Sequence, residues 1–226
     1  MKDKGIILFT RIPVQGKTKT RLEPFLGKDL CVKLQTAFLK DIYTSVKETG
    51  IDIIVNYSED GSLKILKDIL GEDQFFLRQN GDGLGEKMHK GISFALKQYK
   101  QVVLIGSDLP LIKRRDIEVA FKILATKDIV ISPTFDGGYY LIGMSEENKE
   151  IFDLQYSRED VFEETIGKIG SIGKTFGTGN IQFDIDTKSD LIGLYEILKE
   201  SEEVSCPNTR KIVYKIMEEC GVYEGN

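Results

Sequence analysis

Histidine and cysteine are scarce in this sequence of 226 residues, which argues against two kinds of chemistry. His89 is the single histidine, and it lies about one turn into an expected helix, where we predict a packing or surface residue and no catalytic scheme built on histidine. The three cysteines, Cys31, Cys206 and Cys220, form no CxxC pair and leave one over in any disulfide scheme. We therefore expect the cysteines to be buried, to pack as small hydrophobic residues and to stay reduced, as in a reducing compartment.

Long apolar runs and a positive net charge are also absent. The longest apolar runs, such as residues 51–55 and 102–105, fall far short of the ~20 residues that span a bilayer, and no signal-peptide segment follows the polar residues 1–4. Asp and Glu number 36 against 31 Lys and Arg, a formal net charge of −5 that disfavours attraction to nucleic acid or an anionic membrane. We expect a cytoplasmic protein with no nucleic-acid partner and no membrane insertion.

What the chain does contain is enough apolar sequence for a sizeable core. With 41% hydrophobic and 30% charged residues, its length favours a single domain over residues 1–226. We expect a C-terminal helical tail over about residues 201–226. This tail either packs on the core or forms a homodimer contact.

Short β-rich segments alternate with segments of helical period. We expect strands at 6–9, 51–55, 75–77, 102–105, 129–131 and 139–142, a strand end near 183–187, and helices at 30–46, 63–70, 84–96 and 117–124. Capping boxes, Ser157 with Asp160 and Thr187 with Asp190, open two further helices. The connection between strands 129–131 and 139–142 is too short for a parallel crossover, so we expect an antiparallel or splayed pair. The pattern predicts a three-layer α/β/α fold whose mostly parallel mixed sheet contains one reversed strand.

A basic loop follows the first strand. Residues 11–21 hold four cations, Arg11, Lys17, Lys19 and Arg21, with no acid and with Gly16 for a tight turn. Lys and Arg clustered at a strand end supply donors and positive charge for phosphate oxygens, which predicts a nucleotide-binding loop. The alternative is a solvated basic loop.

Two familiar nucleotide-binding motifs are excluded. A P-loop needs glycine where Arg11 precedes Gly16-Lys17-Thr18 and where Lys168 precedes Gly173-Lys174-Thr175. A dinucleotide-binding GxGxxG built on Gly81 and Gly83 would need a third glycine where Glu86 stands. A Rossmann dehydrogenase is therefore disfavoured.

Acidic residues lie at two expected strand ends. Asp108, between Gly106 and the turn fixed by Pro110, is well placed to hold a hard cation, although it could instead cap the next helix. Alternation along the second segment sends Asp184 and Asp186 to one face. We predict that Asp108, Asp186 and Asp184 bind Mg²⁺ (or Mn²⁺) bridging to a diphosphate.

Two glycine-containing loops complete the candidate site. The paired glycines of the Asp136, Gly137 and Gly138 loop allow close backbone approach to a ligand. Tyr139 is first an aromatic strand residue, with a hydroxyl that could face the substrate. After the third strand, side chains and free amides for base edges come from Gln79, Asn80, Gly81 and Gly83.

Four motifs, in order along the chain, resemble the radical-SAM/selenodomain-associated transferases. They are R-x-P-x-x-G-x-x-K-T-R-L at 11–22, G-S-D-x-P at 106–110, D-G-G-Y-Y-L-I-G at 136–143 and D-x-D-T at 184–187. The resemblance implies the GT-A nucleotide-diphospho-sugar transferase fold, in a family often named as glycosyltransferases. The same fold houses sugar-phosphate, molybdopterin and phospholactate nucleotidyltransferases, whose first loop is also basic and contains glycine.

The resemblance also implies residue roles. It places Lys17, Lys19 and Arg21 on nucleotide phosphates, residues 79–83 near the base, Asp108 and Asp186 on the metal, and residues 136–138 near the acceptor. We take Lys19, Asp108 and Asp186 as the catalytic candidates. The sequence departs from GT-A glycosyltransferases that carry Asp-x-Asp after the middle strand, because only one carboxylate is present there, and this argues against a strict Asp-x-Asp metal site.

The expected function is a metal-dependent transferase that uses an activated nucleotide. The first interpretation is a glycosyltransferase moving a sugar from a nucleotide-diphospho-sugar to a small acceptor. The second is a guanylyl-, cytidylyl- or uridylyltransferase that joins an NTP to a small phosphorylated or hydroxyl substrate and releases pyrophosphate. The basic loop favours the second, since a triphosphate carries more charge, whereas the family name favours the first. A non-catalytic nucleotide-binding protein is the third.

Overall fold

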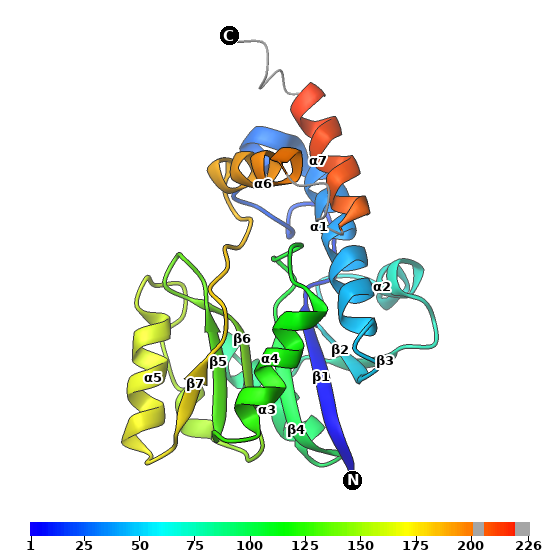
Figure 1. Cartoon of the computed structure of the whole chain (residues 1–226). Coiled ribbons are helices and arrows are strands. Elements are labelled where there is room, and N and C mark those ends of the chain that lie inside the picture. Colours follow the sequence, from blue (N-terminus) through cyan, green and yellow to red (C-terminus); the bar gives the residue numbers. More distant parts are fainter. Residues whose placement is uncertain (201–205, 220–226) are drawn as a thin grey trace.

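The computed structural model describes residues 1–200 and 206–219 (Figure 1). Cys220 and parts of the expected tail over 201–226 lie outside the described residues. Seven strands form one sheet in the order β3-β2-β1-β4-β6-β5-β7. The strands are β1 (Lys2–Thr10), β2 (Asp52–Tyr57), β3 (Phe75–Arg78), β4 (Tyr99–Ile105), β5 (Ile129–Pro133), β6 (Tyr139–Met144) and β7 (Phe176–Thr178).

Helices cover both faces of this sheet, so the predicted three-layer α/β arrangement is confirmed (Figure 1). One face packs against α1 (Glu23–Lys47), α2 (Leu63–Leu70), α4 (Arg114–Leu124), α6 (Lys188–Glu200) and α7 (Pro207–Glu219). The other face packs against α3 (Leu84–Leu96), the 3₁₀ helix η1 (Lys149–Phe152) and α5 (Val161–Ser171). Alternation along β1 explains the division, because Ile6 and Leu8 enter the first core and Ile7 the second.

The reversed strand is β6, as predicted. It pairs antiparallel with both β4 and β5, whereas the other neighbouring strands run parallel. Since β5 and β6 form a hairpin, their connecting loop lies at the carboxyl end of β5. This edge also receives the loops that follow β1 and β4.

Helix α1 begins seven residues before the predicted start at residue 30 and is kinked at Gly27. Gly27 has φ 74°, a left-handed conformation that glycine adopts without a Cβ penalty. Pro24 lies in the first turn, where its missing N–H costs nothing. The apolar stripe from residue 30 onward therefore predicted the continuous part of the helix but not the turn before the kink.

Three predictions about the last third of the chain need comment. The expected strand near 183–187 is wrong, because this segment makes only one bridge, between Thr134 and Gln182, and then leaves the sheet. Strand β7 was not predicted, since its three residues lie in a glycine-rich segment. The capping box at Ser157 is also wrong, because α5 begins after Asp160 without a side-chain cap. The box at Thr187 is confirmed by Asp190 Oδ2, which accepts from the Thr187 N–H at 2.7 Å.

The histidine and the described cysteines are packing residues. His89 is buried on α3, with Nε2 2.7 Å from a Glu147 carboxylate oxygen and its ring against Phe152. Cys31 and Cys206 are buried free thiols, and burial raises the pKa of each to about 11. Within the described ranges, the helices are too short or too polar to cross a membrane.

Candidate functional site

The candidate site lies at the edge of the sheet where β1, β4 and β5 end. The loop after β1 contributes Lys19 and Arg21, and the loop after β4 contributes Asp108. The segment between β7 and α6 approaches this edge and is fastened there, since the Ile185 N–H donates to the Asp108 carbonyl at 3.2 Å. Ligands of open α/β sheets bind at such carboxyl edges.

Lys19 is at the centre of this edge. Its Nζ lies 2.5 Å from Asp108 Oδ1 and 3.2 Å from Asp186 Oδ1, and it donates to the Ile185 carbonyl at 2.7 Å. The side chain is only 2% exposed, and Nζ stands 5.4 Å from the centre of the Phe38 ring. An ammonium group has three N–H donors, so three protein acceptors satisfy it completely.

The two carboxylates keep this buried lysine charged. Burial alone lowers the pKa of Lys19, but the negative charges and hydrogen bonds of Asp108 and Asp186 outweigh it, and the net pKa lies above the ordinary value. Lys19 is therefore an ammonium ion throughout the neutral range. It is a buried cation held by two anions, the arrangement that makes such a charge tolerable.

The backbone of Lys19 is strained into place. Its φ is 51°, the left-handed region that costs a non-glycine residue roughly 1–2 kcal/mol. The Lys19 carbonyl accepts from the Leu22 N–H at 2.9 Å and from the Cys31 thiol at 3.5 Å, which fixes this conformation. Strain of this kind persists where the surroundings over-determine a residue, and it is concentrated at functional sites.

Asp184 lies near the charges of Asp136, Asp186 and Asp108, and we call these four residues the acid cluster. Burial raises the pKa of Asp184 to about 6. The nearby charges of Asp136, Asp186 and Asp108 act in the same direction. The structure thus brings together acids from three segments far apart in the sequence, as the sequence analysis anticipated for Asp108 and Asp186.

The donor set fits a hard divalent cation in part. Asp108 and Asp186 present oxygens to one shared point, which is the ligand type that Mg²⁺ prefers. Over residues 1–200 and 206–219, no three His, Cys, Asp or Glu side chains are arranged to hold one ion, so the predicted trio with Asp184 is not a preformed cage. Mg²⁺ is ordinarily bound by one or two carboxylates together with substrate phosphates and water, and the pair Asp108 and Asp186 suits that mode.

Helix α1 supports both halves of the site, a role that was not predicted from the sequence. Gln35 Nε2 donates to the Ser107 carbonyl at 2.8 Å and to Ser107 Oγ at 3.2 Å, directly beside Asp108. One helical turn earlier, the Cys31 thiol donates to the Lys19 carbonyl. A signal was present, because Gln35 is a polar residue next to the apolar stripe of Leu34, Phe38 and Ile42. Asp108 itself does not cap the following helix, since the N-cap of α4 is Lys113.

The predicted phosphate-binding cations divide into two groups. Arg21, an exposed side chain, stands 3.8 Å from Asp186 Oδ2 and so belongs with Lys19 at the acid cluster. Lys17 is exposed and donates to the Asp60 carbonyl at 3.4 Å, and Arg11 is exposed at the end of β1. Gly16 has φ 73°, as expected for a tight turn in this loop. The basic loop thus presents exposed cations around one buried cation.

The segment predicted to lie near the base follows β3. Gln79 Nε2 donates to the carbonyls of Thr10 at 3.1 Å and Asn56 at 3.0 Å, so this amide ties β1 to β2 and could meet a base only through its oxygen. Asn80 is exposed, Gly81 has φ 132°, and Gly83 is the N-cap of α3. The segment remains a candidate base contact mainly through its backbone and Asn80.

The predicted acceptor loop joins β5 to β6. Asp136 Oδ1 accepts from Thr134 Oγ1 at 2.5 Å and from the Gly138 N–H at 3.1 Å. Gly137 has φ 86°, and a Cβ there would lie 1.7 Å from the Glu159 carbonyl, so glycine is required. Tyr139 is an aromatic residue of β6, as predicted, and packs against the second core; its hydroxyl lies 3.4 Å from the Tyr156 hydroxyl, and burial raises its pKa well above the usual value.

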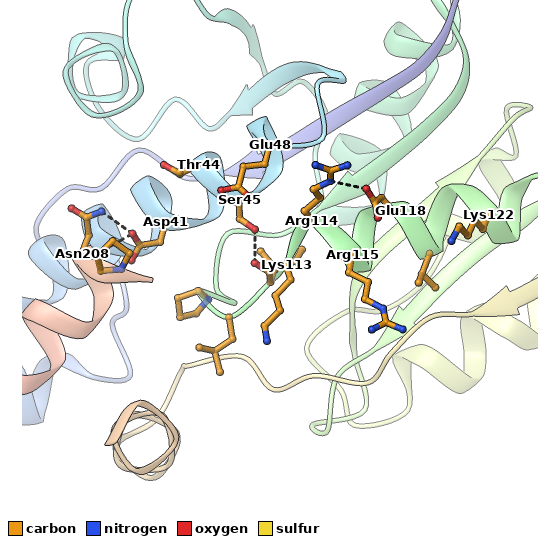
Figure 2. A pocket seen from close by; sticks show the side chains of 15 residues that line it. Asp41, Thr44, Ser45, Glu48, Lys113, Arg114, Arg115, Glu118, Lys122 and Asn208 are labelled. Carbon is orange, nitrogen blue, oxygen red and sulfur yellow. Dashed lines mark hydrogen bonds and ion pairs between the residues drawn. The ribbon is translucent and has the colours of Figure 1, made fainter. Parts of the chain in front are cut away.

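A separate cavity of about 690 Å³ lies between α1, α4 and the start of α7 (Figure 2). Lys113, Arg115 and Lys122 line it from the α4 side, and Asp41 and Glu48 from α1. No member of the acid cluster lines this cavity. The candidate site is therefore an open edge of the sheet and not this cavity.

The fold is that of the nucleotide-diphospho-sugar transferase class of α/β proteins. A crystal structure from Desulfovibrio desulfuricans G20, assigned provisionally as a nucleotide-diphospho-sugar transferase, is 29% identical, with a TM-score of 0.90 over 100% of both chains. A cytidylyltransferase from Leptospira borgpetersenii shares the fold at 13% identity, with a TM-score of 0.58 over 98% of this chain and 96% of that one.

The chain belongs to the family DUF2064, described as "Uncharacterized protein conserved in bacteria", whose model matches residues 27–158. Among curated relatives, the 2-phospho-L-lactate guanylyltransferase of Methanocaldococcus jannaschii is 30% identical over 67% of this chain and 65% of its own length. A second, from Methanocaldococcus sp. FS406-22, is 29% identical over 64% of this chain and 61% of its own length. The matches thus span just under two thirds of these relatives.

Proposed function

We propose that this protein is a nucleotidyltransferase that joins a nucleoside triphosphate to a small phosphorylated acceptor and releases pyrophosphate. The observation that carries the proposal is the convergence of Lys19, Asp108 and Asp186 at the carboxyl edge of the sheet, with Arg21 beside them. The guanylyltransferase names of the curated relatives support this second interpretation of the sequence over glycosyl transfer.

The proposed chemistry needs charge stabilisation more than a covalent intermediate. An acceptor oxygen attacks the α-phosphorus, a new P–O bond forms, and the bond from the α-phosphorus to the bridging oxygen breaks so that pyrophosphate carries away the electron pair. Arg21 and Lys17 are the exposed cations that bind phosphate oxygens and neutralise the departing pyrophosphate.

Asp108 and Asp186 would hold a divalent ion in this proposal. When bound, Mg²⁺ withdraws charge from the phosphate oxygens and orients the triphosphate. Gln35 positions Asp108 by holding the Ser107 peptide, and the Ile185 N–H holds the Asp108 carbonyl. These contacts fix the two carboxylates relative to each other before substrate arrives.

The finer specificity is also a proposal. The relatives' name indicates guanine as the base and a phosphorylated hydroxy acid as the acceptor class. In this chain we assign the base to the backbone of residues 79–83 and the acceptor to residues 136–138, where Gly137 and Gly138 permit close approach. Magnesium as the ion, a cytoplasmic location, homodimer formation and an association with radical-SAM proteins remain predictions from the sequence.

The test is pyrophosphate release by the full chain from GTP, CTP, UTP and ATP with Mg²⁺ and a panel of phosphorylated hydroxy acids. We expect release with GTP and one such acceptor. Thermal stabilisation by UDP- or GDP-sugars with metal and none by triphosphates would instead support glycosyl transfer. Tight triphosphate binding without turnover across the panel would indicate a non-catalytic nucleotide-binding protein.

A further inference from the structure

Lys19 occupies the point at which two carboxylates of the acid cluster meet. Asp108 Oδ1 and Asp186 Oδ1 both contact its ammonium group, at 2.5 and 3.2 Å. A divalent ion held by these two oxygens would occupy the point where the ammonium group now lies. The lysine and such an ion therefore compete for one place.

Lys19 has no easy way to withdraw. Its side chain is 2% exposed, its third donor is on the Ile185 carbonyl, and its left-handed backbone is fixed through Leu22 and Cys31. If an ion took both carboxylates, the ammonium would lose its counter-charges while still buried. An unpaired buried charge is strongly unfavourable, so the ion alone is a poor competitor.

We propose that Lys19 is the resident cation of the acid cluster, so that a divalent ion enters only together with a nucleotide whose phosphates replace Asp108 and Asp186 as partners of the ammonium. The inference rests on the proposed function, because it concerns how a nucleotidyl-transfer site acquires its ion. The inference specifies the order of binding, because the ion does not bind before the nucleotide.

The chain also suggests why a cation should reside there at all. Without one, Asp108 and Asp186 would repel each other across the point that their oxygens share. Lys19 holds the loop after β4 and the segment before α6 together in the absence of substrate. Before substrate arrives, it thus takes the place of a metal ion between the two carboxylates.

The experiment measures Mn²⁺ binding to the full chain by electron paramagnetic resonance of the free ion, without nucleotide. Lys19→Met removes the charge and keeps a side chain of similar length. We expect this variant to bind Mn²⁺ at least about tenfold more tightly than the wild type, because the carboxylates are left without a cation. Lys17→Met, which removes a charge from the same loop away from the carboxylates, should bind Mn²⁺ as the wild type does.

Equal Mn²⁺ affinity of Lys19→Met and wild type would overturn the proposal, and so would an equal gain in Lys17→Met. If Lys19→Met does not fold, the wild type decides alone, after subtraction of the Mn²⁺ that the same concentration of GTP binds without protein: weak binding of Mn²⁺ that strengthens at least about tenfold when GTP is added supports the proposal, and tight binding without nucleotide overturns it. The Mn²⁺ affinity without nucleotide is measured without any turnover. If the protein proves not to catalyse the proposed reaction, this measurement still decides whether Lys19 competes with the ion.

Discussion

Asp108 is the residue on which the proposed chemistry depends most directly. Its carboxylate contacts Lys19, while its backbone carbonyl holds Ile185, so the side chain can be neutralised without removing the backbone contact. A substitution at Asp108 can therefore remove the side-chain charge while the backbone hydrogen bond to Ile185 is kept. This makes the isosteric change to asparagine more informative than truncation.

Asp108→Asn should lower kcat for pyrophosphate release by about 100-fold or more, because a charge that organises the transition state is lost. The thermal unfolding curve should still show one cooperative transition. Asp3→Asn is the matched control, since Asp3 is exposed and pairs with Lys100 at the opposite edge of the sheet. Full activity in Asp108→Asn would remove this residue from the catalytic assignment.

Asp184 gives the protein a pH-dependent stability in metal-free buffer. Burial raises its pKa from 3.8 to about 6, so between these values the folded protein keeps a proton that the unfolded chain has lost. The contribution of Asp184 to the free energy of unfolding therefore falls as pH rises through this window and is constant above it. Asp184→Asn, which cannot ionise, should lack this decrease.

Urea denaturation with EDTA at pH 4.5, 5.5 and 7 measures the effect. The difference in stability between Asp184→Asn and wild type should grow in favour of the variant as pH rises. Asp73→Asn, a change of the same type at an exposed position, should give a pH-independent difference. A pH-independent difference for Asp184→Asn as well would show that Asp184 titrates normally.

Among the helices and strands, α1 holds the loops of the candidate site in place. Gln35→Leu should lower the free energy of unfolding by about 1–3 kcal/mol, since it leaves the buried Ser107 peptide without its donor. It should also lower kcat/KM about tenfold, because the loop that bears Asp108 loses its clamp. Steady-state kinetics and urea denaturation measure the two effects.

Gln101→Leu is the matched control for this change. Gln101 Nε2 donates to the Leu124 carbonyl at 2.9 Å, a partly buried bond from a side-chain amide to a backbone carbonyl away from the site. We expect a similar loss of stability with kcat/KM unchanged. Equal losses of kcat/KM in both variants would mean that Gln35 acts only through general stability.

The sequence predicted helices well where the hydrophobic periodicity extends over several turns. The helix over 63–70 and the helix over 84–96 match α2 and α3 at both ends, because each bears an apolar stripe bounded by Ser62, Gly71 and Gly83. The prediction of a strand at 183–187 was wrong, because alternation of Asp and apolar residues is also typical of an extended segment that crosses the edge of a sheet without pairing. Tertiary contacts such as that between Ile185 and Asp108 decide whether the segment pairs as a strand, and a local sequence pattern does not predict such contacts.

At the scale of the whole molecule, α7 is joined to α1 through one buried carboxylate. Asp41 accepts from the Asn208 N–H at 3.2 Å, from Asn208 Nδ2 at 2.7 Å and from the Thr209 N–H at 2.6 Å. The side chain of one helix thus caps the first turn of another. Figure 1 shows α6 and α7 gathered with α1 at the end of the molecule away from the N-terminus.

Asp41→Ala should lower the free energy of unfolding by about 1–2 kcal/mol, the usual effect of losing an N-cap. Asp68→Ala removes an exposed carboxylate that pairs with Lys64 and should change stability by less than about 0.5 kcal/mol. Chemical denaturation of both variants makes the comparison. An Asp41→Ala value as small as that of Asp68→Ala would show that α7 docks by apolar packing alone.

Much of the overall topology followed from connection lengths. Helices between successive strands predict parallel neighbours, and the short link before β6 predicts its reversal. The rule that strand ends share an edge accounts for Asp108, which follows β4, whereas Asp186 reaches the same edge on the extended segment between β7 and α6. The partnership of Lys19 with both was not predictable, because residues 19, 108 and 186 are brought together only by the kinked entry into α1 and by the crossing of the segment before α6.

The hairpin of β5 and β6 has a consequence for how this architecture diversifies. Each end of its tip is held by an interior strand, so the exposed positions Phe135 and Asp136 can be exchanged without rerouting the rest of the chain, whereas Gly137 is fixed by its contact with Glu159. A parallel strand at the position of β6 would have required a helical crossover, and any change there would alter the packing of a whole layer. Reversal of one strand thus confines the effect of such exchanges to the loop that we propose for the acceptor.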